Sequence, residues 1–156
     1  MKILITYYSR TNITEKVAKT IQNNLSCDIE EIIDLKNRSG ALGYVKSCLD
    51  AIRKTPADIK PIEKDPSDYD LVIIGTPVWA STMASGVLTY LNENKEKFND
   101  VSFFCTCGSS GYEETLNKME EIVDKKAVER LFITKKDLNT SFDSKIQDYT
   151  KKLNQS

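Results

Sequence analysis

The chain alternates short apolar runs with longer segments in which apolar residues recur at every third or fourth position. The runs predict five strands, at residues 2–8, 28–34, 70–75, 101–105 and 128–133. The periodic segments predict five helices, at 15–25, 41–53 and 84–97 and around 116–123 and 142–153. The run at 70–75 contains four consecutive apolar residues, which indicates a central strand buried on both faces. The last run contains Glu129 and Arg130 and suits the edge of a sheet.

The alternation of strands and helices predicts an α/β fold in which helices cover both faces of a parallel sheet. Because crossovers between parallel strands are right-handed, we expect a three-layer, doubly wound, five-stranded parallel sheet of order 2-1-3-4-5. The chain contains no repeat, linker or low-complexity tract, so we expect one domain over residues 1–156. Such sheets bind ligands beyond the carboxyl ends of their strands, here between the first and third strands.

The segment between the first strand and the first helix has the composition of an anion-binding loop. It consists of Ser9, Arg10, Thr11, Asn12, Ile13 and Thr14. The first N–H groups of a helix lack intrahelical partners, and the helix dipole adds about half a positive charge there. Three hydroxyl groups of this segment can donate hydrogen bonds to the same anion. Asn12 followed by Glu15 also fits a simple helix cap, but a cap needs only one such residue. The pattern therefore favours a phosphate site.

Two further loops lie at the same edge of the predicted sheet. Residues 75–83 follow the third strand and carry Trp79, the only tryptophan of the chain, on a turn fixed by Pro77. Residues 106–111 follow the fourth strand and hold two glycines, which permit close approach of the backbone to a ligand. An aromatic side chain across the switch point from a phosphate site predicts a mononucleotide with a flat heterocycle.

Composition removes several classes of function. Twenty-two basic and 23 acidic residues are interleaved along the chain, which argues against nucleic-acid binding. The absence of histidine excludes Ser-His-Asp and Cys-His catalysis, and the four cysteines show no metal-ligand spacing. Their pattern indicates free thiols in a reducing compartment. With no secretory h-region and no 18-residue apolar run, we expect a cytoplasmic protein without a membrane partner.

These motifs together resemble those of flavodoxins and of flavodoxin-like FMN proteins of the short type. The resemblance rests on YYSRTNITEKVA at 7–18, YDLVIIGTPVWAS at 69–81 and FCTCGSSG at 104–111. The segment SGALGYVKSCLDAIRK at 39–54 is also similar, so the likeness covers essentially the whole chain. It implies a flavodoxin-like fold with FMN as the cofactor and electron transfer as the function, in which the flavin does the chemistry.

The resemblance also implies a role for each loop. The phosphate would be held by Ser9, Arg10, Thr11, Asn12, Ile13 and Thr14. One side of the flavin ring would be lined by Thr76, Pro77, Val78, Trp79 and Ala80. The pyrimidine end would meet Thr106, Cys107, Gly108, Ser109, Ser110 and Gly111. No residue is assigned a catalytic role, and no metal ligand is expected.

Three features depart from the family pattern. Asn12 and Ile13 stand where relatives have glycine and a polar residue, and Asn tolerates the positive φ that such a turn needs. We expect phosphate binding to be kept but weakened. Trp79 is followed by Ala80 and Ser81, where many relatives have a glycine whose peptide flips beside the flavin. We therefore expect weaker stabilisation of the one-electron-reduced ring. The net charge of −1 is small for a flavodoxin that docks on basic partners.

The near-neutral charge leaves a second function open, an FMN-dependent NAD(P)H:quinone-type oxidoreductase. Expected partners are a redox protein or an NAD(P)H-linked reductase, with the chain a monomer or weak homo-oligomer. Loss of FMN through the change at Asn12 and Ile13 is a further alternative. A signalling receiver domain shares the strand order but needs acidic residues after the first and third strands. This chain has Tyr7, Tyr8 and Gly75 at those places, which excludes that class.

Overall fold

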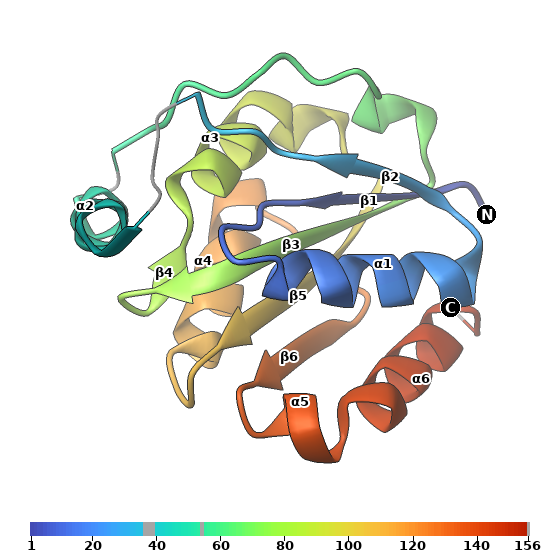
Figure 1. Cartoon of the computed structure of the whole chain (residues 1–156). Helices are drawn as coiled ribbons and strands as arrows, with labels where there is room; N and C mark the ends of the chain where they lie inside the picture. The colour runs from blue at the N-terminus through green and yellow to red at the C-terminus, as the bar shows by residue number, and fades with distance from the viewer. Residues whose placement is uncertain (36–39, 54, 156) are drawn as a thin grey trace.

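The computed structural model describes residues 1–35, 40–53 and 55–155 and forms three layers, a central sheet with helices on both sides (Figure 1). The strands are β1 Ile3–Tyr7, β2 Asp28–Glu31, β3 Leu71–Trp79, β4 Thr82–Met83, β5 Asp100–Cys107 and β6 Arg130–Thr134. The α-helices are α1 Ile13–Leu25, α2 Gly40–Ile52, α3 Ser85–Asn94, α4 Tyr112–Val123, α5 Asp137–Thr140 and α6 Phe142–Leu153. Two 3-10 turns, η1 Pro66–Asp68 and η2 Lys95–Lys97, complete the described elements. None of the described helices has the length and apolar content needed to span a bilayer.

The main sheet is parallel and has the order β2-β1-β3-β5-β6, with β4 paired antiparallel to β3 at one end. The predicted order 2-1-3-4-5 is confirmed once the short β4 is set aside. Successive side chains of β3 face opposite layers: Val72 and Ile74 pack with α3 and α4, whereas Leu71 and Ile73 pack with α1 and α6. The apolar residues 71–74 of this run are therefore buried on both faces, as predicted.

β3 extends four residues beyond its predicted end. Gly75 and Pro77 suggested a loop, but Thr76 pairs with Cys105 and Pro77 with Thr106, so the strand continues to Trp79. It then turns through Ala80 and Ser81 into β4, with Trp79 opposite Thr82. Both turn residues adopt positive φ, 49° and 57°, as a two-residue hairpin requires. A hairpin thus replaces the expected open loop.

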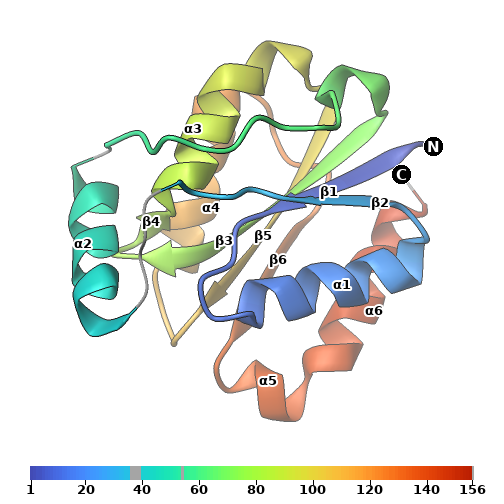
Figure 2. The ribbon, with the colours of Figure 1, turned by 45° about the horizontal axis from the view of Figure 1, so that its top comes forward.

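Helix α2 stands at the side of the sheet beside β4 (Figure 2). The apolar spacing of Leu42, Val45 and Leu49 suggested a buried face, yet all three side chains are exposed. The side chain of Ile52, the fourth residue of that pattern, lies outside the described set. Instead, Cys48 packs against the core, and the helix contacts α3, β3 and β4. The pattern identified the helix correctly but not which of its sides is covered.

Candidate functional site

The carboxyl ends of β1, β3, β5 and β6 surround a cleft of about 420 Å³. Its lining is Arg10, Thr11, Ile13, Thr14, Pro77, Val78, Trp79, Thr106, Cys107, Gly108, Ile133, Lys135, Leu138 and Asn139. The first ten belong to the predicted site, so three segments far apart in sequence meet at the predicted switch point. A larger hollow of about 530 Å³ beside residues 57–62 contains none of the predicted residues.

Seven predicted residues lie outside this lining: Ser9, Asn12, Thr76, Ala80, Ser109, Ser110 and Gly111. Thr76 and Gly111 contact the β3–β4 hairpin instead, as described below. The four additional lining residues, Ile133, Lys135, Leu138 and Asn139, come from the end of β6 and from α5. This wall was not predicted from the sequence.

The loop after β1 enters α1 through Asn12, whose φ of 64° is in the left-handed region. Asn therefore does replace glycine at this turn, as expected from its tolerance of positive φ. Its side chain makes no capping hydrogen bond, so the simple cap suggested by Asn12 and Glu15 is wrong. The first intrahelical bond runs from Lys16 N to Asn12 O at 3.0 Å. The N–H groups that precede it in the first turn remain available to an anion.

Two hydroxyl groups of this loop are buried in different states. Within the described chain, Ser9 Oγ and Ser85 Oγ are the two buried side-chain oxygens without a hydrogen-bond partner. Thr14 Oγ1 instead lies 2.8 Å from Thr106 Oγ1, which ties the loop to β5. One of these two hydroxyls donates to the other, so the acceptor keeps a hydrogen for another partner. An unpartnered, buried Ser9 hydroxyl in the loop that leads into α1 fits a bound phosphate, because burying an unsatisfied hydroxyl is costly.

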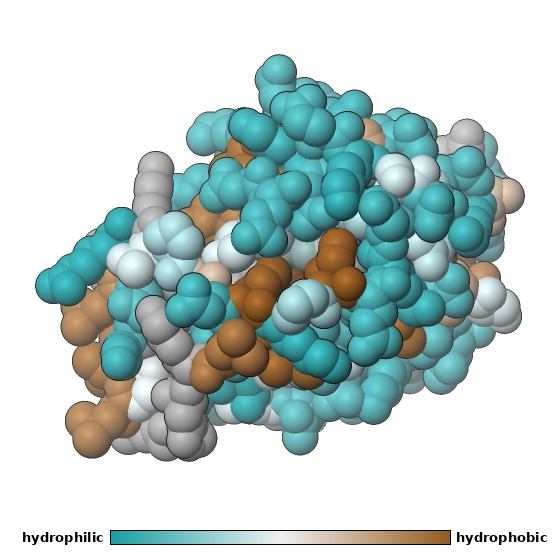
Figure 3. All heavy atoms as spheres, turned by 90° about the horizontal axis from the view of Figure 1, so that it is seen from above, coloured by the Kyte–Doolittle hydropathy of each residue, from teal (hydrophilic) through white to brown (hydrophobic). Residues whose placement is uncertain are grey.

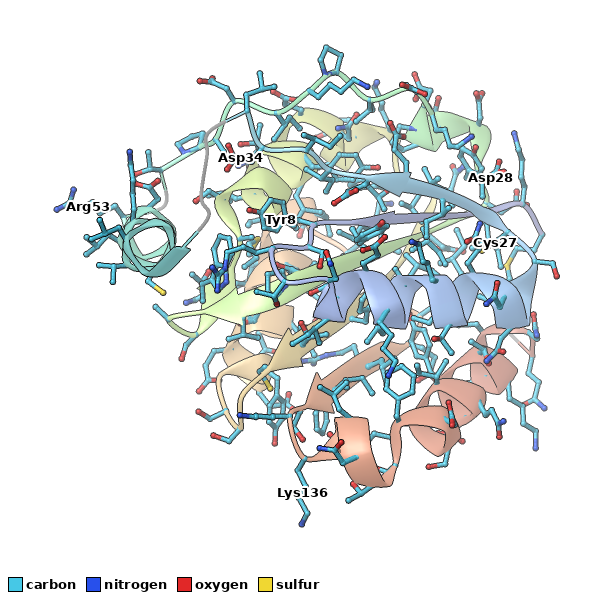
Figure 4. The ribbon with its side chains drawn as sticks, in the orientation of Figure 1. Tyr8, Cys27, Asp28, Asp34, Arg53 and Lys136 are labelled. Carbon is cyan, nitrogen blue, oxygen red and sulfur yellow. The ribbon has the colours of Figure 1, made fainter. Side chains whose placement is uncertain are left out.

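Trp79 is buried rather than open to the cleft as a free platform. Its side chain is only 3% exposed, and its ring meets that of Tyr8 edge-on, with centroids 5.4 Å apart at 84°. Tyr8 lies between the end of β1 and α3 (Figure 4). The edge contact fixes the indole in place, so only part of it borders the cleft.

The β3–β4 hairpin is held from both sides. Thr76 Oγ1 donates to Pro77 O at 2.9 Å and accepts from Ala84 N at 3.0 Å, which gives this buried threonine a structural role. Lys118 of α4 donates to Ser81 O at 3.0 Å. Gly111, at φ 85°, lets α4 begin against the turn, because a Cβ there would lie 3.0 Å from Ser81 Oγ. The cleft therefore has a braced rim on this side.

The fourth wall is fixed by a capped turn between β6 and α5. Lys135 N donates to Cys107 O at 3.0 Å and to Gly108 O at 3.2 Å. Asp137 Oδ2 accepts from Thr134 N at 2.8 Å and from Lys145 Nζ at 2.9 Å. Burial alone would raise the pKa of Asp137, but these bonds outweigh it and hold the pKa well below its usual range. Thr134 followed by Asp137 is a capping-box pattern, which was the sequence feature that could have located this turn.

The cleft is suited to an anionic ligand. Its lining includes Arg10 and Lys135, and among the described residues no acidic side chain lines it. Burial, followed by the charge of nearby Asp137, raises the pKa of the Cys107 thiol, which keeps it protonated and unreactive. All four cysteines are free thiols, and the described chain contains no cluster of His, Cys, Asp or Glu that could hold a metal ion. The cationic lining therefore favours a ligand that carries a phosphate.

Comparison with known proteins gives a consistent result. A family model for flavodoxins matches residues 2–153. A flavoprotein from Lactobacillus acidophilus, crystallised in complex with FMN, is 25% identical, with a TM-score of 0.77 over 96% of this chain and 98% of that one. A putative flavoprotein from Bacteroides uniformis is 19% identical (TM-score 0.80, 96% and 97% covered). Oxidised flavodoxin 2 from Bacillus cereus is 16% identical (TM-score 0.67, 99% of each covered).

No curated protein matches the sequence significantly. The family model nevertheless covers almost the entire chain, and the matched structures share its fold. The chain belongs to the flavodoxin family.

Proposed function

We propose that this protein is an FMN-binding electron carrier that holds the flavin at the carboxyl ends of β1, β3 and β5. The observation that carries the proposal is the buried, unpartnered Ser9 hydroxyl in the loop between β1 and α1, next in sequence to Arg10, which lines the cleft together with Lys135. Membership of the flavodoxin family and the FMN complex of the Lactobacillus acidophilus flavoprotein support it.

In this proposal each segment of the cleft has one task. Ser9, Thr11 and the N–H groups at the start of α1 bind the phosphate, and the Thr14–Thr106 bond keeps that loop in register with β5. Residues 77–79 and 106–108 form the two walls of a slot for the flat ring. FMN, when bound, accepts and releases electrons, while the protein positions it and excludes water.

Four further assignments complete the proposal. Ile133 and Leu138 give the slot an apolar floor toward α5, and Asn139 supplies an amide to the bound cofactor. Ala80, Ser109, Ser110 and Gly111 act through the backbone of the hairpin and of the α4 start rather than by lining the cleft.

We infer one domain in a reducing compartment such as the cytoplasm, which the four free thiols support.

Turnover distinguishes the carrier from an FMN-dependent NAD(P)H:quinone oxidoreductase. FMN-loaded protein is mixed with NADPH and a quinone, with and without a flavodoxin reductase, and NADPH oxidation is followed by absorbance. A carrier is reduced only when the reductase is present. Sustained NADPH oxidation without reductase, at turnover of about 1 per second or more, would assign the enzyme instead.

A further inference from the structure

The exposed apolar side chains of this protein are concentrated around α2. Among the described residues, the large hydrophobic side chains that are exposed are Met1, Ile13, Ile33, Leu35, Leu42, Val45 and Leu49. Five of these seven lie between positions 33 and 49. Figure 3 shows brown side chains gathered at the left edge of the molecule, where α2 lies. Clustered exposed apolar residues mark an interaction site, whereas isolated ones need no explanation.

Basic and apolar side chains share one side of this helix. Leu42, Val45, Lys46, Leu49 and Arg53 follow the spacing i, i+3, i+4, i+7 and i+11, which places them on one face. All five are exposed, and we call them the α2 face. Arg53 points away from the body of the molecule (Figure 4). The opposite side of the helix carries Cys48, which packs on the core.

The sequence around the α2 face is basic, although the whole chain is not. Residues 34–54 contain five basic residues (Lys36, Arg38, Lys46, Arg53, Lys54) and two acidic ones (Asp34, Asp50), a net charge of +3. Since the whole chain carries −1, the remaining residues carry −4. A partner that covers the α2 face must therefore be acidic around an apolar centre.

The same charges argue against two other occupants. A second copy of this chain would place one +3 segment against another, which costs free energy in a symmetric interface. Amphipathic helices that lie in a membrane surface separate a basic side from an apolar side. Here Lys46 and Arg53 lie among Leu42, Val45 and Leu49 on one side. The mixed face favours a protein partner.

Helix α2 packs against the hairpin that carries part of the candidate site. Helix α2 contacts both strands of the β3–β4 hairpin, and β3 carries the cleft residues 77–79. A protein bound on α2 therefore lies beside the cleft. We propose that the α2 face docks an acidic electron-transfer protein, with Leu42, Val45 and Leu49 at the centre and Lys46 and Arg53 at the rim. This inference rests on the proposed function, whose electrons such a partner would supply or receive.

The test measures binding to a plant-type [2Fe–2S] ferredoxin, an acidic electron carrier, by titration calorimetry at low and high salt. One variant combines Leu42→Ser with Leu49→Ser, and a second combines Lys46→Glu with Arg53→Glu. The control combines Lys125→Glu with Lys151→Glu. This makes the same charge change at two exposed positions, one just after α4 and one in α6. Circular dichroism confirms that every variant is folded.

We expect wild-type affinity to fall about tenfold between low and high salt, because exposed charges are screened. Each α2-face variant loses about tenfold or more at low salt, and the control stays within about twofold of wild type. Ferredoxin that fails to bind wild type, or that binds both variants normally, overturns the proposal. Binding of the wild type to phosphatidylserine vesicles and its self-association are measured in the same way. The proposal is also overturned if the α2-face variants lose vesicle binding or self-association but keep ferredoxin binding.

Binding is measured with and without added FMN, and the flavin content of each sample is read from its absorbance. If the flavin bands are missing even with added FMN, the proposed function is contradicted. The calorimetric result on the FMN-free chain still tests whether the α2 face binds ferredoxin. A stopped-flow measurement of electron exchange with ferredoxin then links the two. Slower exchange in the α2-face variants at unchanged flavin content is the expected result.

Discussion

At the scale of single residues, two small residues are needed for different reasons, one for packing of the core and one for the candidate site. Gly75 lies in β3 beneath the ring of Phe104, and a Cβ there would stand 2.0 Å from Phe104 Cζ. Ser9 keeps a buried hydroxyl without a partner in the loop between β1 and α1. The first is a requirement of packing, and the second fits the phosphate role proposed for Ser9.

Gly75→Ala should destabilise the protein by about 3 kcal/mol or more, because the Phe104 ring is enclosed and cannot move without disturbing the core. Urea unfolding followed by circular dichroism measures the change. Gly108→Ala is the matched control, since a Cβ at that position meets nothing within 4 Å. Equal stability of the two variants would show that the ring gives way.

Ser9→Ala should weaken FMN binding about tenfold, since it removes one hydrogen bond to a charged group. The FMN-free protein should be no less stable than wild type, because its lost hydroxyl had no partner. Ser85→Ala, which removes the other unpartnered buried hydroxyl, should leave FMN affinity unchanged. Equal FMN affinity in Ser9→Ala and wild type would contradict the phosphate role of Ser9.

At the scale of elements, sequence periodicity located every helix of eight residues or more and every strand of the main sheet, because burial on two faces leaves a clear pattern. The hairpin was missed, since Pro77 suggested a turn and nothing local shows that Ala80 and Ser81 take positive φ. The covered side of α2 and the burial of Trp79 against Tyr8 depend on contacts between distant segments. The spacing of apolar residues within one element does not predict such contacts.

The capped turn before α5 makes stability depend on pH. The pKa of Asp137 is lowered in the folded state, so the stabilisation is present above its unfolded pKa of about 3.9 and is lost as pH falls through the folded value. Asp137→Asn should therefore cost about 2 kcal/mol at pH 7, and the difference from wild type should shrink below about pH 4. Chemical unfolding across this range measures it.

The control for this prediction is Glu121→Gln, at an exposed position of α4. It should change stability by less than about 0.5 kcal/mol at every pH. A deficit in Asp137→Asn that stays constant from pH 7 to pH 3 would indicate lost packing rather than the lost charge.

At the scale of the whole molecule, the fold brings segments from the ends of β1, β3 and β5 to one cleft and leaves one side of α2 exposed. The convergence of the loops was predictable, because parallel strands end at the same edge of a sheet. The wall from β6 and α5 was not, since Lys135 joins the cleft through backbone bonds to the end of β5. The cationic lining and the start of α1 support the proposal that the cleft binds a phosphate-bearing ligand.

The most direct test of that assignment is an FMN titration of the purified protein, followed by flavin absorbance and fluorescence, with riboflavin in parallel. We predict one FMN per chain and binding of riboflavin about 100-fold weaker, because riboflavin lacks the phosphate that Ser9 and the α1 N–H groups would hold. A protein that stays colourless with excess FMN, or that binds riboflavin as tightly as FMN, would contradict the account.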